Sequence, residues 1–209
     1  WGRVVEIEEP GAAISTIDYD LEGNIVGAED PLGRSGSRVF DNAGQLTSAT
    51  NAKSETSSYA YNSVGYLTSV TNGRGYTRNY TYTDRGQVAS LTLPDSSVEQ
   101  WAYNGNGDTT AYVNPLGQTI NYTYDNAGQQ TGVDYPSGLT DTTLAYDNGG
   151  RTTSMSDVSG TSSWAYNAAD EITDLNTPQG DVDYTYNLAG QVLTLVDVGT
   201  GTTTNTYDS

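Results

Sequence analysis

The chain has 209 residues, of which 26 are acidic and only 8 are basic, so its formal net charge is −18. This charge disfavours binding to nucleic acid and to anionic membrane surfaces, and no stretch approaches the roughly 20 consecutive apolar residues of a membrane-spanning helix. Histidine and cysteine are both absent, which removes imidazole bases, thiol nucleophiles and the usual transition-metal ligands. We therefore predict a protein that binds no nucleic acid, does not insert into membranes and is not an enzyme.

Tyrosine carries most of the apolar surface of this chain. Only 34% of the residues are hydrophobic, yet there are 17 tyrosines and 24 glycines. Disordered chains are poor in aromatic and β-branched residues, whereas this chain is rich in Tyr, Thr and Val. The composition therefore predicts β-strands joined by many turns.

One aromatic residue recurs along the whole chain at spacings of 20 to 22 residues, and we call it the key aromatic. In nine of the ten repeats Asp or Asn follows it, with Thr83 as the exception. Glycine stands four residues after it in every repeat that reaches that position except one, where Asp170 takes its place. The key aromatics are Tyr19, Phe40, Tyr61, Tyr82, Tyr103, Tyr124, Tyr146, Tyr166, Tyr186 and Tyr207.

The pattern around the key aromatic predicts a strand, a turn, a strand and a second turn in each repeat. Two residues before it there is often another aromatic, as at Tyr59 and Trp101, which is typical of strand alternation. About fourteen residues after it a second turn signal appears, as at Gly33 and Gly117. Each repeat is therefore expected to be a β-hairpin.

The exchange of Asp and Asn after the key aromatic indicates that a side-chain oxygen is needed there and a charge is not. We expect this oxygen to accept a hydrogen bond from the backbone two residues on. The following glycine then supplies the positive φ of a tight turn.

The second strand of each repeat carries apolar residues six and nine places after the key aromatic, as in the pairs Leu67 with Val70 and Ile172 with Leu175. A spacing of three breaks strict alternation. Either a β-bulge lies between the two residues or both faces of the strand are partly covered.

The segments Tyr59–Gly65 (YAYNSVG), Tyr122–Gly128 (YTYDNAG) and Tyr184–Gly190 (YTYNLAG) resemble the YD repeat of Rhs proteins, teneurins and the shell subunits of insecticidal toxin complexes. The resemblance covers the whole chain. It implies an all-β fold in which tandem hairpins of about 21 residues form a continuous, spiralling antiparallel sheet, a tube or a partial shell. In large family members the sheet closes around a toxin.

Two features depart from the family. The family often has Arg after the glycine, as in Arg3 and Arg151, whereas this chain mostly has glutamine there. No segment resembles the self-cleaving plug or the toxin of the family, so the cargo function is not carried over. The glutamines in question are Gln45, Gln87, Gln129 and Gln191.

The two ends of the chain complete one turn motif. The chain ends Tyr207-Asp208-Ser209 and begins Trp1-Gly2-Arg3. If the first three residues are written directly after the last three, Gly2 stands four residues after Tyr207, as in nearly all of the other repeats. We expect residues 1–209 to form a single array of about ten repeats, cut within a repeat at both ends. Its expected partners are copies of itself, either as tandem blocks of a longer chain or as stacked subunits.

No catalytic, cofactor-binding or metal-binding residue is predicted. The carboxylate pairs Asp18 with Asp20 and Asp181 with Asp183 formally permit a glycosidase, but they alternate with other residues on strands and are expected to face solvent. The segment Asn104–Asp108 is rich in oxygen ligands suited to a weak calcium ion. We interpret it as a plain turn, so no cofactor is expected.

Glycan binding is an alternative role, because rows of Tyr and Trp can stack on sugars. Two sequons, Asn79-Tyr80-Thr81 and Asn121-Tyr122-Thr123, occupy the same place in their repeats. They are glycosylation sites only if their strands are accessible and the host modifies secreted proteins.

We expect a structural protein that is extracellular or on the cell surface. Its sheet would form the wall of a fibre, sheath or shell, assembled by continuous or end-to-end stacking of strands. One alternative is a fragment of an Rhs-type toxin-encapsulating shell or a large adhesin. The other is an aromatic-rich array that binds glycans.

Overall fold

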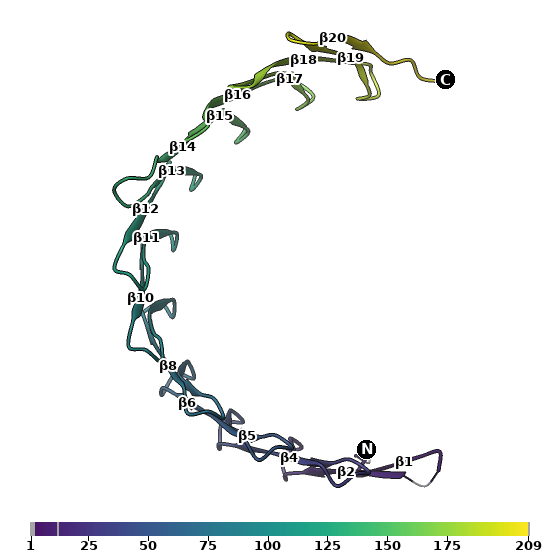
Figure 1. Cartoon of the computed structure of the whole chain (residues 1–209), viewed down its shortest axis with the longest axis vertical. Coiled ribbons are helices and arrows are strands. Elements are labelled where there is room, and N and C mark those ends of the chain that lie inside the picture. Colours follow the sequence, from purple (N-terminus) through teal and green to yellow (C-terminus); the bar gives the residue numbers. More distant parts are fainter. Residues whose placement is uncertain (1–2, 12, 209) are drawn as a thin grey trace. The chain divides into compact units, whose positions relative to one another are not determined.

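The computed structural model describes residues 3–11 and 13–208. Trp1, Gly2 and Ser209, on which the expected match of the two ends depends, lie outside the described residues. The described part of the chain holds 20 β-strands and no α-helix (Figure 1). Accordingly, it contains no helix that is long and apolar enough to cross a membrane.

The chain divides into two compact units. The first comprises the residues up to Trp101 together with Asn114–Gly117, and the second comprises Ala102–Val113 and the residues from Gln118 onward. Strands β1 to β9 belong to the first unit, β11 to β20 belong to the second, and β10 contributes to both. The bounds of the strands are β1 Glu6–Glu9, β2 Ala13–Tyr19, β3 Ile25–Glu29, β4 Ser35–Phe40, β5 Leu46–Thr50, β6 Thr56–Tyr61, β7 Leu67–Thr71, β8 Thr77–Tyr82, β9 Val88–Thr92, β10 Val98–Tyr103, β11 Thr109–Val113, β12 Thr119–Tyr124, β13 Gln130–Asp134, β14 Thr142–Tyr146, β15 Thr152–Asp157, β16 Gly160–Tyr166, β17 Ile172–Thr177, β18 Gly180–Tyr186, β19 Val192–Asp197 and β20 Gly201–Thr204.

Within each unit every strand pairs with the next strand along the chain, always antiparallel. The pairing runs from β1 to β10 in the first unit. It runs from β11 to β20 in the second. The predicted all-β fold of tandem antiparallel hairpins is confirmed.

Each unit is a single layer of sheet. The described strands contact only the strands that neighbour them in chain order, as in other repeat proteins. Among the described residues only Val133, on β13, is buried, with 8% of its surface exposed. The accessible surface is 13797 Å², whereas a compact monomer of this mass exposes about 9,400 Å². The sheet therefore buries no core of the usual kind.

The turn after the key aromatic has the predicted geometry. Oδ1 of Asn62 accepts hydrogen bonds from the backbone N–H groups of Val64 at 3.1 Å and Tyr66 at 2.9 Å. Gly65 has a φ of 91° and donates to the carbonyl of Asn62 at 3.0 Å. The predicted side-chain cap and the predicted role of glycine are confirmed. Asp41, Asp125, Asp147, Asn167 and Asn187 cap their turns in the same way.

The second turn of several repeats uses the same cap, which the sequence analysis did not anticipate. Oδ1 of Asn51 accepts from the backbone N–H of Lys53 at 2.9 Å, and Oδ1 of Asn72 accepts from that of Arg74 at 3.0 Å. In the turn of Asn51 the left-handed position is held by Ser54, with a φ of 62°. A residue with a Cβ is strained in this conformation.

Replacing Ser54 by glycine is expected to raise the free energy of unfolding by about 0.5–1 kcal/mol, because the strain of the left-handed conformation exceeds the entropy that glycine loses on folding. Urea denaturation followed by circular dichroism measures the change. Ser63→Gly is the matched control, since Ser63 lies in a turn without a positive φ. Equal effects of the two substitutions would contradict the explanation.

A β-bulge explains the spacing of three between the apolar residues of the second strand. On β6 and β7, Tyr61 lies opposite Leu67 and Ala60 lies opposite Ser69, so that Thr68 has no partner. The same shift recurs next to seven other key aromatics, namely Tyr19, Phe40, Tyr82, Tyr124, Tyr146, Tyr166 and Tyr186. Both alternatives hold: the bulge is present, and every residue of β7 is half-buried, so both faces of this strand are partly covered. The bulge returns both apolar residues to the face that carries the tyrosines.

Candidate functional site

The sheet of each unit has two chemically different faces. The tyrosine face carries the key aromatic, the residue two places before it, and the apolar residues six and nine places after it. On β6 the side chains of Tyr59 and Tyr61 are half-buried on this face, whereas Ser58 and Ala60 on the opposite face are exposed. We call the opposite face the hydroxyl face, because Ser and Thr dominate it.

The key tyrosines join consecutive repeats through their hydroxyl groups. The Oη atom of Tyr82 donates to the carbonyl of Leu67 at 2.7 Å, and that of Tyr124 donates to the carbonyl of Thr109 at 2.8 Å. In every such bond the acceptor is the residue six places after the preceding key aromatic, beside the bulge. The same bond is made by Tyr61, Tyr146, Tyr166, Tyr186 and Tyr207.

We call this row of bonds the hydroxyl ladder. It is made by the key tyrosines of the tyrosine face, not by the hydroxyl face, and it was not predicted from the sequence. One signal pointed to it: nine of the ten key aromatics are Tyr and one is Phe, although either ring could fill an apolar site. Desolvation by burial raises the pKa of Tyr82, Tyr124 and Tyr186 above the ordinary value of 10.0. Nearby Asp108 and Glu171 raise the pKa of Tyr124 and Tyr186 further.

The residue after the turn glycine forms a second connection between repeats. Nε2 of Gln45 donates to the carbonyl of Gly65 at 3.0 Å, and Nε2 of Gln129 donates to the carbonyl of Gly150 at 3.1 Å. Nη1 of Arg151 reaches the next turn in the same way, at the carbonyl of Asn167, 3.1 Å away. Gln and Arg are exchangeable at this position because both donate a hydrogen bond from a long side chain.

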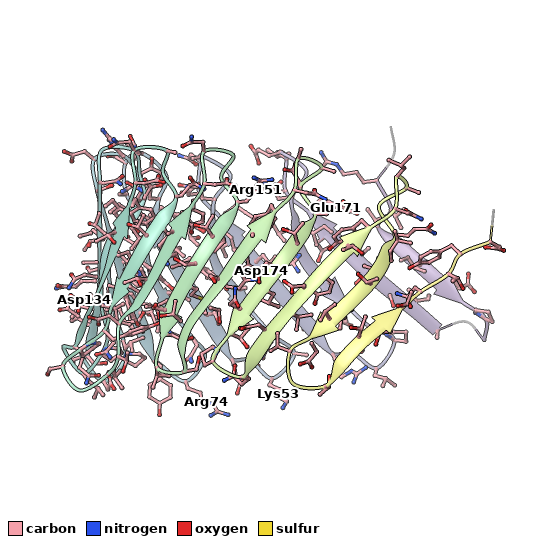
Figure 2. All side chains as sticks on the ribbon, turned by 90° about the horizontal axis from the view of Figure 1, so that it is seen from above. Lys53, Arg74, Asp134, Arg151, Glu171 and Asp174 are labelled. Carbon is pink, nitrogen blue, oxygen red and sulfur yellow. The ribbon has the colours of Figure 1, made fainter. Side chains whose placement is uncertain are left out.

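Arg151 is the most highly connected of these residues. Its guanidinium binds Asp147 at 2.7 and 2.6 Å and Asp170 at 2.6 Å, and it lies 4.7 Å from the ring centroid of Tyr166. The hydrogen bond from Arg151 lowers the pKa of Asp147. Because the side chain of Asp170 is 79% exposed, solvent screens that ion pair. Arg151 and Glu171 both lie at the edge formed by the key turns (Figure 2).

The two carboxylate pairs considered for catalysis are arranged differently. Asp18 is exposed on a strand, whereas Asp20 caps a turn and accepts from the backbone N–H of Gly23 at 2.7 Å. Asp181 and Asp183 lie two residues apart on β18, so both are on the hydroxyl face of the second unit. Asp174 lies in the middle of its strand on this face (Figure 2), and Asp183 is opposite it. Such a pairing of like charges is destabilising. The described residues contain no group of three or more acidic side chains placed to hold a metal ion.

The segment Asn104–Asp108 forms a turn whose oxygens serve the turn itself. Oδ1 of Asn104 accepts from the backbone N–H groups of Asn106, Gly107 and Asp108 at 2.9 to 3.0 Å. Its Nδ2 donates to a carboxylate oxygen of Asp108 at 2.9 Å. This geometry agrees with the interpretation of the segment as a plain turn.

Both sequons lie on the hydroxyl face. Asn79 and Asn121 are exposed, as are the threonines two residues after them. The amide of Asn121 donates to Asp134 at 3.0 Å. Their modification stays a prediction.

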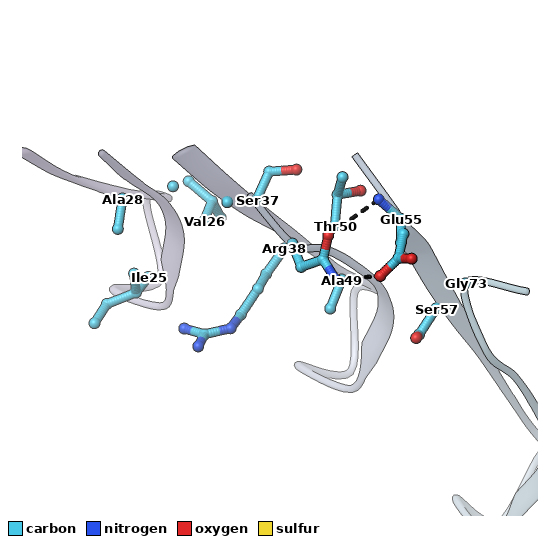
Figure 3. Close-up of a pocket in the computed structure, with 13 residues that line it drawn as sticks. Ile25, Val26, Ala28, Ser37, Arg38, Ala49, Thr50, Glu55, Ser57 and Gly73 are labelled. Atoms are coloured by element: carbon cyan, nitrogen blue, oxygen red, sulfur yellow. Dashed lines mark hydrogen bonds between the residues drawn. The ribbon is translucent and has the colours of Figure 1, made fainter. Parts of the chain in front are cut away.

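Arg38 interrupts the tyrosine face in the first unit. Arg38 on β4 stands two residues before Phe40, where six of the ten repeats have an aromatic, and it lies opposite Ala49. Small residues beside it, among them Ala28 and Gly36, leave an open hollow into which Arg38 projects (Figure 3). The rows of aromatic residues invoked for glycan binding are therefore not continuous along this face.

Comparison with known families finds two matches. The model of the RHS repeat matches residues 103–140, and the model of the teneurin YD-shell matches residues 11–119, which is more than half of the chain. Comparison with curated protein sequences gave no match.

Solved structures of toxin complexes share the fold. The crystal structure of TcdB2-TccC3 superposes with a TM-score of 0.59 at 14% identity over 94% of this chain. The Tc holotoxin pore of Photorhabdus luminescens gives a TM-score of 0.54 at 14% identity over 88%, and TcdB2-TccC3-TEV gives 0.53 at 13% over 96%. The chain spans only 12%, 13% and 16% of those three chains, respectively.

Proposed function

Because the chain belongs to the teneurin YD-shell family, we propose that it is a segment of a structural wall outside the cell, assembled by continuous or end-to-end stacking of its β-sheet. The family and the fold are those of structural shell repeats. In more detail, we propose that the wall belongs to a fibre, a sheath or a shell. Its proposed partners are further copies of the same repeat. The absence of enzymatic activity stays a prediction.

The observation that carries this proposal is the open, single-layer sheet. Among the described residues each repeat contacts only its neighbours, so no other described strand covers the half-buried tyrosine face within either unit. An ordinary domain gains its stability by closing around a core. This chain instead repeats one set of connections, the hydroxyl ladder and the bonds from Gln45, Gln129 and Arg151, and these connections extend equally well to additional repeats.

A second candidate is a segment of an Rhs-type shell that encloses a toxin, or of a large adhesin. It is supported by the superposition on the TcdB2-TccC3 structures, of which this chain spans 12% to 16%. The two candidates share the wall and differ in what the wall encloses.

A labelling experiment tests whether the sheet is a wall in its native assembly. The chain has no cysteine, so single substitutions report on each face separately. Ser57→Cys places a thiol on the tyrosine face, opposite Ala49, and Ser58→Cys places one on the hydroxyl face, opposite Ser48. Both substitutions are introduced into the protein as its host produces it.

In a closed wall, one of the two thiols is expected to react with a small maleimide but not with a maleimide attached to a large polymer. The other thiol is expected to react with both reagents. After unfolding in urea, both thiols should react with both reagents, which controls for intrinsic reactivity. Equal reaction of the two thiols with the polymer reagent in the native assembly would refute the wall.

A further inference from the structure

Tyr66 occupies an unusual place in the pattern of repeats. It follows the glycine of the key turn, where the other repeats have Gln, Arg, Asn, Asp or Glu, and 39% of its surface is exposed. Its ring lies against the ring of Tyr82, the key aromatic of the next repeat. The two ring centroids are 4.9 Å apart and the planes are tilted by 37°, which places the rings in van der Waals contact.

Both rings are held in position by their surroundings. The hydroxyl of Tyr82 donates to the carbonyl of Leu67 at 2.7 Å. On the other side, a Cβ atom at Gly86 would overlap the hydroxyl and the ring of Tyr66. The missing side chain of Gly86 therefore makes the room in which Tyr66 lies over Tyr82.

We propose that Tyr66 and Tyr82 are a site of oxidative cross-linking, at which a one-electron oxidant such as a haem peroxidase joins the two rings as dityrosine. Each phenol loses one electron to the oxidant and one proton to solvent, leaving a phenoxyl radical. The two radicals combine by forming one carbon–carbon bond between positions ortho to the hydroxyls. Each of these carbons then gives up its hydrogen, and each oxygen is protonated again.

The net change is the loss of two electrons and two protons. Hydrogen peroxide accepts them and is reduced to two molecules of water. Because the rings already touch, coupling needs no diffusion of the two radicals. The product ties two consecutive hairpins of the sheet covalently, and this consequence is independent of the kind of wall that the sheet builds.

The experiment treats the folded chain with a haem peroxidase and hydrogen peroxide and then digests it with trypsin. Cleavage after Lys53, Arg74, Arg78 and Arg85 separates Tyr66, in peptide 54–74, from Tyr82, in peptide 79–85. We expect these two peptides to be joined, with a mass lower than their sum by two hydrogen atoms, and to show the violet fluorescence of dityrosine. Fragmentation of the joined peptides locates the bond.

Substitutions and a denatured sample make the result specific. Tyr66→Phe keeps the ring but cannot form a phenoxyl radical, so the joined peptide should disappear, whereas Tyr76→Phe removes a phenol that is 57% exposed and should leave it unchanged. Gly86→Ala keeps both phenols but displaces Tyr66, so the yield should fall below that of Gly128→Ala, which strains a turn at nearly the same φ without meeting a neighbouring atom. Oxidation in urea should lower the yield of the Tyr66–Tyr82 cross-link to that of the other tyrosine pairs.

The proposal is overturned if the joined peptide forms equally in urea or in Tyr66→Phe. It is also overturned if other tyrosine pairs couple in the folded chain while this pair does not.

Discussion

Replacing Tyr124 by alanine is expected to lower the free energy of unfolding by about 2–3 kcal/mol. The substitution removes a half-buried ring from the tyrosine face and the hydrogen bond from its hydroxyl to the carbonyl of Thr109. Burial of such a ring and one hydrogen bond to a partly buried carbonyl together account for this magnitude. Urea denaturation followed by circular dichroism measures the loss.

Two further substitutions separate the ring from the hydroxyl. Tyr124→Phe keeps the ring and loses only the bond, so its expected cost is about 1 kcal/mol. Phe40 is the key aromatic without a hydroxyl, and Phe40→Tyr is expected to add a rung to the ladder and to stabilise the chain by about 0.5–1 kcal/mol. If Tyr124→Phe were without effect, the hydroxyl ladder would not contribute to stability.

Raising the pH above 10 is expected to unfold the sheet. The pKa values of Tyr82, Tyr124 and Tyr186 are raised above 10.0, mainly by burial. The folded state therefore holds these protons more tightly than the unfolded state does. The resulting stability is fully present below pH 10 and is lost as the pH rises through the raised pKa values. Each tyrosinate also adds to a net charge that is already −18, which increases self-repulsion.

The measurement compares the ultraviolet absorbance of tyrosinate with the circular dichroism of the strands during an alkaline titration. We expect the two signals to change together. A variant in which Phe replaces Tyr82, Tyr124 and Tyr186 should be less sensitive to alkali. Between neutral and high pH, its free energy of unfolding should fall by a smaller fraction than that of the unmodified chain. A strand signal that persists after all 17 tyrosines have ionised would contradict the prediction.

The caps of the turns set the opposite limit of this pH range. Hydrogen bonds lower the pKa of Asp20 and Asp147 below the ordinary value of 3.8, chiefly bonds from the side chains of Asn24 and Arg151, respectively. Carboxylates of this kind stabilise the fold above pH 3.8 and cease to do so as the pH falls through the lowered pKa values. The chain is therefore expected to be most stable between these two limits.

The repeat, the hairpin and the turn can all be predicted from the sequence alone. The cap at Asn62 and the positive φ at Gly65 follow from residues within four positions of one another, so their pattern is legible without a structure. The alternation of Tyr59 and Tyr61 likewise shows which residues share a face. Because these signals are local and recur in almost every repeat, they also supported the family resemblance.

The contacts that connect one repeat to the next are visible only in the tertiary structure. The structure revealed the bulge at Thr68 together with the partial cover of both faces of β7, since the pairing of two strands, and not the spacing within one, leaves a residue without a partner. The hydroxyl of Tyr82 binds a backbone carbonyl fifteen residues away, and every residue has such a carbonyl, so no side-chain pattern marks the acceptor. The contact between Tyr66 and Tyr82 likewise depends on the register of neighbouring hairpins, which fixes distances that the sequence does not contain.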